Sequence, residues 1–177
     1  RSTTFKGSRT LQVPWAKEPM PAAVQQARGF DYRGRIRVTP VATDTAVPFE
    51  LRYDVVERGD RWLAAKAVPP SGVAGQDLRV RSSSQLTGLW VPPAHCAQLR
   101  LGTVLDRDPL TRAAVSVTYV DEEVVTLAQK SPKQDFQFTY RKRDGLLVRG
   151  RFADVLTTAP GVPPMHKVVE IDLAGVR

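Results

Sequence analysis

The stretch that decides the fold is residues 30–38, which read FDYRGRIRV. Apolar residues and one glycine stand at the even positions, whereas Asp31 and three arginines stand at the odd positions. Successive side chains of an extended chain point to opposite faces, so a period of two predicts a strand with one buried and one charged face. We therefore predict a strand whose outer face carries a row formed by Arg33, Arg35 and Arg37.

The same alternation recurs after this stretch, and turn signals separate the runs. Asp144-Gly145 is the strongest of these signals, because this dipeptide favours the tight turn of a hairpin. No amphipathic helix of ten or more residues interrupts the series, which disfavours a parallel α/β sheet. The sequence therefore predicts an all-β fold, an antiparallel meander of about ten strands that forms a barrel or a sandwich.

The first 28 residues differ from the rest, since they are rich in Ser, Thr, Pro and Gln and show no clean period. We predict an irregular N-terminal arm over residues 1–28 and a single antiparallel β domain over residues 29–177. Within the arm, the alternating pattern of residues 11–15 predicts an edge strand, because Pro14 has no N–H to donate to a ladder. Trp15 is then expected to cover apolar surface of the domain or of a neighbouring copy.

The chain is basic, with 26 Lys and Arg against 18 Asp and Glu and a formal net charge of +8. Such a balance favours an anionic partner. The candidate polyanion-binding residues, taken from strand faces and one turn, are Arg33, Arg35, Arg37, Arg79, Arg81, Arg141, Lys142 and Arg143. The alternative is that carboxylates across the strands neutralise these cations, with Glu50, Asp54, Asp77 and Asp135 as the expected partners.

No phosphate loop, dinucleotide fingerprint, metal-ligand spacing or nucleophile elbow occurs in the sequence. The chain has one cysteine and two histidines, so Cys96 with His166 is the one conceivable thiol pair. We therefore expect no catalytic residue, no metal site and no cofactor, and we disfavour an enzyme. No apolar run approaches the roughly 20 residues of a membrane-spanning helix, so no transmembrane segment is expected.

These observations favour a non-catalytic binding or structural module that acts through a sheet face or an apolar cavity. Its location is expected to be outside the cytoplasm of a bacterium, either periplasmic or secreted. The alternative function is a protein that binds nucleic acid or another polyanion through arginine-rich strand faces. The partner classes left open are an anionic polymer, an apolar small molecule and another protein.

Overall fold

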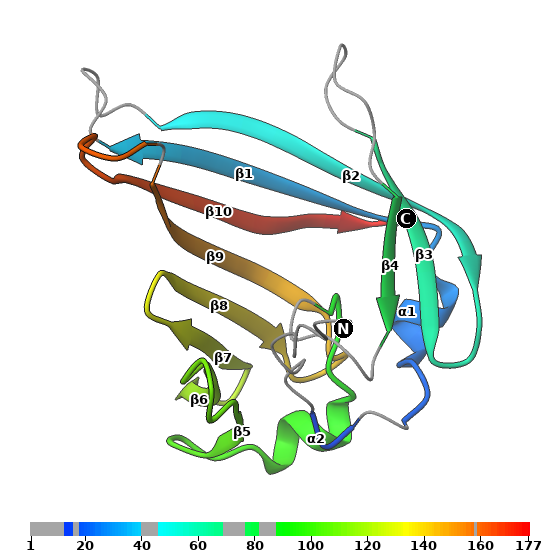
Figure 1. Cartoon of the computed structure of the whole chain (residues 1–177). Coiled ribbons are helices and arrows are strands. Elements are labelled where there is room, and N and C mark those ends of the chain that lie inside the picture. Colours follow the sequence, from blue (N-terminus) through cyan, green and yellow to red (C-terminus); the bar gives the residue numbers. More distant parts are fainter. Residues whose placement is uncertain (1–12, 16–17, 40–45, 69–76, 82–87, 158) are drawn as a thin grey trace, which may run out of the picture.

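The computed structural model describes residues 13–15, 18–39, 46–68, 77–81, 88–157 and 159–177, and of residues 77–81 it describes the backbone alone. Two short helices and ten strands follow one another in this part of the chain (Figure 1). In chain order they are α1 (Ala22–Gln26), β1 (Gly29–Thr39), β2 (Val47–Arg58), β3 (Trp62–Val68), β4 (Asp77–Arg81), α2 (Pro93–Gln98), β5 (Val104–Arg107), β6 (Ala114–Val120), β7 (Val124–Ser131), β8 (Gln134–Arg141), β9 (Leu147–Leu156) and β10 (Met165–Val176).

All ten strands form one antiparallel sheet in the order β4-β3-β2-β1-β10-β9-β8-β7-β6-β5. Every pair of adjacent strands but one is also consecutive in the sequence. The exception is the pairing of β1 with β10. The predicted all-β antiparallel meander is confirmed. The sheet curls strongly in Figure 1 but stays open, because β4 and β5 form its two ends instead of pairing with each other.

The strand register places the apolar side chains in rows across one face, which we call the inner face. One row runs through Phe49, Gly34, Ile171, Gly150, Phe138, Leu127 and Val117. The next row, toward the end of β1, runs through Val47, Ile36, Val169, Phe152, Phe136, Gln129 and Val115. Adjacent positions on each strand, including the arginines of β1, therefore lie on the outer face.

Two glycines of the first row let aromatic rings lie against the sheet. A Cβ atom added to Gly34 would collide with the ring of Phe49, and one added to Gly150 would collide with the ring of Phe152. We expect a bend or bulge where glycine interrupts a strand, but the register of β1 with β10 shifts between Asp31 and Tyr32, and that of β8 with β9 between Thr139 and Tyr140, not at the glycines. Ring packing therefore accounts for these glycines better than a bulge does.

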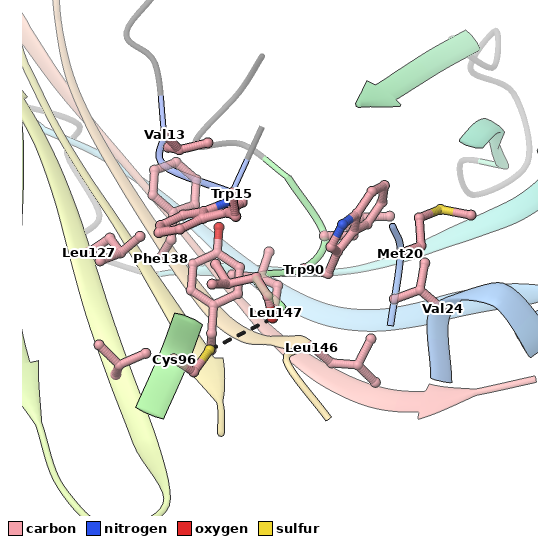
Figure 2. Packing of buried hydrophobic residues seen from close by; sticks show 14 of the residues in the cluster. Val13, Trp15, Met20, Val24, Trp90, Cys96, Leu127, Phe138, Leu146 and Leu147 are labelled. Carbon is pink, nitrogen blue, oxygen red and sulfur yellow. Dashed lines mark hydrogen bonds between the residues drawn. The ribbon is translucent and has the colours of Figure 1, made fainter. Parts of the chain in front are cut away.

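A layer of irregular chain and the two helices covers one end of the inner face. Trp15, Val24 and Trp90 leave 3%, 0% and 2% of their surface exposed, and they belong to one cluster with Phe30 and Tyr140 of the sheet. Figure 2 shows this packing from close by, with residues of the N-terminal layer drawn beside sheet residues. We call this part of the inner face the filled end.

Two buried tyrosine hydroxyls anchor the filled end. Tyr32 donates to the Leu147 carbonyl and Tyr140 donates to the Gly88 carbonyl, each at 3.0 Å. Burial raises the pKa of both tyrosines well above the ordinary value of about 10. The hydroxyls therefore remain protonated donors, and each satisfies a backbone carbonyl that is removed from water.

Two local predictions of strands need correction. Pro14 and Trp15 form a turn, so no strand is present over residues 13–15, although Trp15 is buried as expected. Residues 11 and 12 lie outside the described residues. The apolar residues of 86–91 predict a strand, but the described part of this stretch has one isolated bridge, between Trp90 and Leu146, and residues 86–87 lie outside the described residues.

Helix α2 is not predicted by the sequence, because proline cannot donate to a sheet ladder and Pro92-Pro93 therefore indicates the end of a strand. Pro93 instead opens α2, where a proline at the first helical position costs no hydrogen bond. The alternation of residues 99–105 predicts a strand, but the strand begins only at Val104, because Leu99 caps the helix and residues 101–102 form a turn. Within the described ranges, neither helix has the length or the apolar character to cross a bilayer.

Candidate functional site

The inner face changes character along its strands, and its second end is exposed. Val47 lies opposite Ile36 on the inner face but leaves 62% of its surface exposed. Leu156, near the end of β9, leaves 38% exposed. In Figure 1 these strand ends extend away from α1 and α2. We call the inner-face side chains of Val47, Phe49, Ile36, Val169, Phe152 and Phe136 the open end.

Aromatic rings form the centre of the open end. The ring of Phe152 lies 5.5 Å from that of Phe136 and 5.5 Å from that of Phe138, and both pairs meet edge to face. Phe49, Phe136 and Phe152 are half-buried and pack against the core cluster. Such a surface is rigid and apolar, and it offers contact area at little cost in side-chain entropy.

Polar residues border the open end one row further out. There Lys167 of β10 lies opposite Val38 of β1 and Asp154 of β9, and Asp154 lies opposite Gln134 of β8. The two charged side chains are half-buried. The inner face therefore passes from an apolar row to a row that contains hydrogen-bonding groups of both kinds.

On the outer face, four arginines surround two carboxylates on three neighbouring strands. The register places Asp172 between Arg33 and Arg149, and Glu170 between Arg35 and Arg151. Arg35 Nη2 lies 2.8 Å from Glu170 Oε2, and Arg149 Nε lies 2.9 Å from Asp172 Oδ1. Arg151 Nε approaches Glu170 Oε1 at 3.9 Å. We call these six residues the arginine ladder.

The structure gathers the β1 members of the predicted polyanion-binding set on the outer face of the sheet. The row on β1 belongs to the arginine ladder or continues it at Arg37. Arg79 and Arg81 lie on β4, three strands away, which corresponds to about 14 Å at ordinary strand spacing. The direction of their side chains lies outside what the structure describes. Their part in polyanion binding stays a prediction.

The cluster at residues 141–143 lies at the turn that joins β8 to β9. Arg141 makes a two-pronged bond to Asp144, with Nη2 to Oδ2 at 2.6 Å and Nε to Oδ1 at 3.1 Å. Burial acts to raise the pKa of Asp144, but the bonds from Arg141 and the Leu146 N–H outweigh it and hold this pKa below its usual value. Arg141 thus helps to fix the hairpin, and Glu122 and Glu123 line the same hollow as Arg143.

The acidic partners also differ from those expected. Glu50 lies opposite Arg33 in the register, but the ion pairs of the described residues include none between them, and Asp54 pairs with Arg52 and Arg177. The carboxylates that hold the ladder are Glu170 and Asp172, which were not among the expected partners. Arg149 and Arg151 were missed as candidates too, although the repeated Arg-Gly-Arg segments at 33–35 and 149–151 marked both rows.

Cys96 and His166 lie in different environments. Cys96 is fully buried in α2, where its thiol donates to the Val91 carbonyl at 3.7 Å (Figure 2). Burial raises the pKa of Cys96 to about 12. His166 is exposed near the start of β10, opposite Val155 and Thr39. A buried thiol with a raised pKa is a poor nucleophile at neutral pH.

Comparison with known proteins identifies no family for this chain. No protein-family model matches the chain, and no curated protein sequence matches it as a relative.

Proposed function

We propose that the protein is a non-catalytic binding module that holds an apolar small molecule, with the hydrocarbon part lying on the open end of the inner face. The carrying observation is the contrast within one face: Phe30 is fully buried, whereas Val47 on the same face leaves 62% of its surface exposed. Exposed apolar side chains that continue a core are a common mark of a ligand or partner surface.

Shape and chemistry favour a ligand with an extended hydrocarbon chain. The curled sheet presents a concave face, and the edge-to-face rings of Phe136 and Phe152 form its floor. The polar row of Lys167 and Asp154 lies where the head of such a molecule would leave the apolar surface. Fatty acids and related acyl compounds combine these two parts. Location outside the cytoplasm of a bacterium belongs to the same proposal and rests on composition and loop character alone.

The test compares two neighbouring valines of β10 that face opposite sides. Val169 lies on the inner face and packs against the core cluster, whereas Val168 lines a hollow of the outer face with Arg35 and Arg37. Both are half-buried, so Val169→Asn and Val168→Asn are matched changes. Binding of a fluorescent long-chain fatty acid is measured by titration, after the thermal unfolding of each variant confirms that it is folded.

We expect Val169→Asn to weaken binding at least about tenfold, because a polar group then replaces apolar contact worth 1.4 kcal/mol or more. Val168→Asn should leave the affinity within about twofold of the wild type. Absence of binding by the wild type, or equal losses in the two variants, would overturn the proposal.

A further inference from the structure

The arginine ladder on the outer face has more donors than its own carboxylates use. Arg35 and Arg149 leave 64% and 71% of their side-chain surface exposed, although each contacts a carboxylate. A guanidinium carries five N–H donors, and each of these ion pairs occupies only one or two of them. Arg33 is exposed, and no ion pair involves it among the residues that the structure describes. The ladder therefore presents several oriented cationic donors to solvent.

Two hollows meet over the ladder. One, of about 310 Å³, is lined by Arg35, Arg37, Ala46, Arg151, Val168 and Glu170. The other, of about 280 Å³, is lined by Arg35, Arg149, Arg151 and Glu170 together with Gln137, Thr139, Gly150 and Asp172. Because they share Arg35, Arg151 and Glu170, they form one trough across β1, β10, β9 and β8. Each is near the lower size of ordinary ligand pockets, roughly 300 Å³.

The chemistry of the trough points to a particular class of anion. Glu170 and Asp172 would repel a polymer that offers only phosphates, but carboxylates accept hydrogen bonds from hydroxyl groups. Gln137 adds an amide that both donates and accepts. A ligand that carries anionic groups and hydroxyl groups in alternation satisfies both sets. Sugars with sulfate or carboxylate substituents have this composition.

The spacing of the ladder suits a repeating chain. Arginines two residues apart on one strand are separated by about 6.6 Å, and the rows of β1 and β9 are separated by about 9.6 Å, because β10 lies between them. Base stacking by nucleic acids relies on exposed aromatic rings. None of the described residues that line the trough is aromatic. We propose that the arginine ladder and its trough bind an acidic polysaccharide, independently of the apolar ligand on the inner face.

The test uses labelled heparin as the probe and measures its binding by fluorescence polarisation at two salt concentrations. Arg35→Gln with Arg151→Gln removes two ladder cations. Arg100→Gln with Arg112→Gln removes the same charge from two exposed arginines outside the ladder, one after α2 and one between β5 and β6, and serves as the matched control. Glutamine keeps a donor for Glu170, and thermal unfolding checks that both double variants fold.

We expect the ladder variant to bind heparin at least about tenfold more weakly, with its salt dependence lowered by about two charges. The control should stay within about threefold of the wild type. Gln137→Ala should weaken binding without changing the salt dependence, because it removes a hydroxyl partner and no charge.

Three results would overturn the proposal. The first is that the wild type fails to bind heparin at low salt. The second is that the ladder and control variants lose affinity equally, which would assign the effect to net charge. The third is that single-stranded DNA of equal charge competes as well as unlabelled heparin, which would assign the trough to a different polymer.

Discussion

The filled end and the open end of the inner face share one set of strands but differ in their cover. At the filled end, Phe30 and Tyr32 of β1 pack beneath Trp15, Trp90 and α1 and leave almost no surface exposed. At the open end, Ile36 continues the same strand face, and its neighbour Val47 is mostly exposed. The difference shows that the amino-acid pattern of the strands does not decide which part of a sheet becomes core. The chain outside the sheet decides it.

The largest expected effect comes from the cover of the filled end. Trp15→Ala should lower the free energy of unfolding by about 3–5 kcal/mol, because the side chain is buried in the core cluster. Urea unfolding measures this change. Leu101→Ala is the control, since Leu101 leaves 69% of its surface exposed, and should change stability by less than about 0.5 kcal/mol. A loss below about 1 kcal/mol for Trp15→Ala would show that the filled end is not core.

The corresponding change at the open end should cost less stability. Phe152 is half-buried, and its removal leaves the rings of Phe136 and Phe138 in place. We expect Phe152→Ala to lower the free energy of unfolding by about 1–2 kcal/mol, below the range for fully buried aromatic residues. The same variant should lose affinity for a long-chain fatty acid. A loss as large as that of Trp15→Ala would remove the distinction between the two ends.

Removing a polar anchor of the filled end should lower the free energy of unfolding by a similar or smaller amount than Phe152→Ala. Tyr140→Phe removes the hydroxyl that donates to the buried Gly88 carbonyl and should lower stability by about 1 kcal/mol. Tyr119→Phe is a matched control, because Tyr119 is half exposed and donates to the exposed Asp121. Equal effects of the two substitutions in urea unfolding would contradict the assignment of Tyr140 as an anchor.

The smallest effect concerns the thiol at the filled end. Cys96 has a pKa of about 12 in the folded protein, against about 8.5 in an unfolded chain. Stability from the buried neutral thiol is complete below about pH 8.5 and is lost as the pH rises toward 12, because only the unfolded state loses the proton. Between pH 7 and pH 9 this loss stays below about 1 kcal/mol.

The stability of the Cys96→Ala variant should therefore fall less steeply than that of the wild type over that pH range. Urea unfolding at several pH values measures this difference. Iodoacetamide should label the native wild type only slowly at pH 7.5. Rapid labelling would show that the thiol is accessible and ionised, and it would reopen the possibility of a catalytic cysteine.

The sequence predicted the strands and the pairing of consecutive strands, but not the pairing of β1 with β10. The period of two located β1, β2, β3 and β8, and the Asp144-Gly145 signal located the hairpin of β8 and β9, because these patterns are local. The pairing of β1 with β10 joins residues more than a hundred positions apart. Without that pairing, the arginines of 33–35 and 149–151 could not be recognised as one surface around Glu170 and Asp172.

For the candidate site, the sequence predicted only its kind, an apolar sheet face, and not its position on the sheet. An apolar sheet face followed from the alternation, but its division into a filled and an open end depends on where Trp15, α1 and α2 lie. Those elements carry no periodic signal: α1 and α2 have five and six residues, too few for an amphipathic pattern. The basic surface was predicted from charge and strand alternation, which do not reveal ion-pair partners, so the pairing of Arg141 with Asp144 was missed.

The most direct test measures where on the inner face an apolar ligand binds. Methyl-labelled valines report on both ends, and dodecanoate serves as the ligand in a chemical-shift titration followed by NMR. The account predicts that the methyl signals of Val47 and Val169 shift with a common affinity, whereas those of Val24, Val117 and the outward-facing Val168 stay unchanged. Shifts confined to Val24 and Val117, or no shift at saturating dodecanoate, would contradict it.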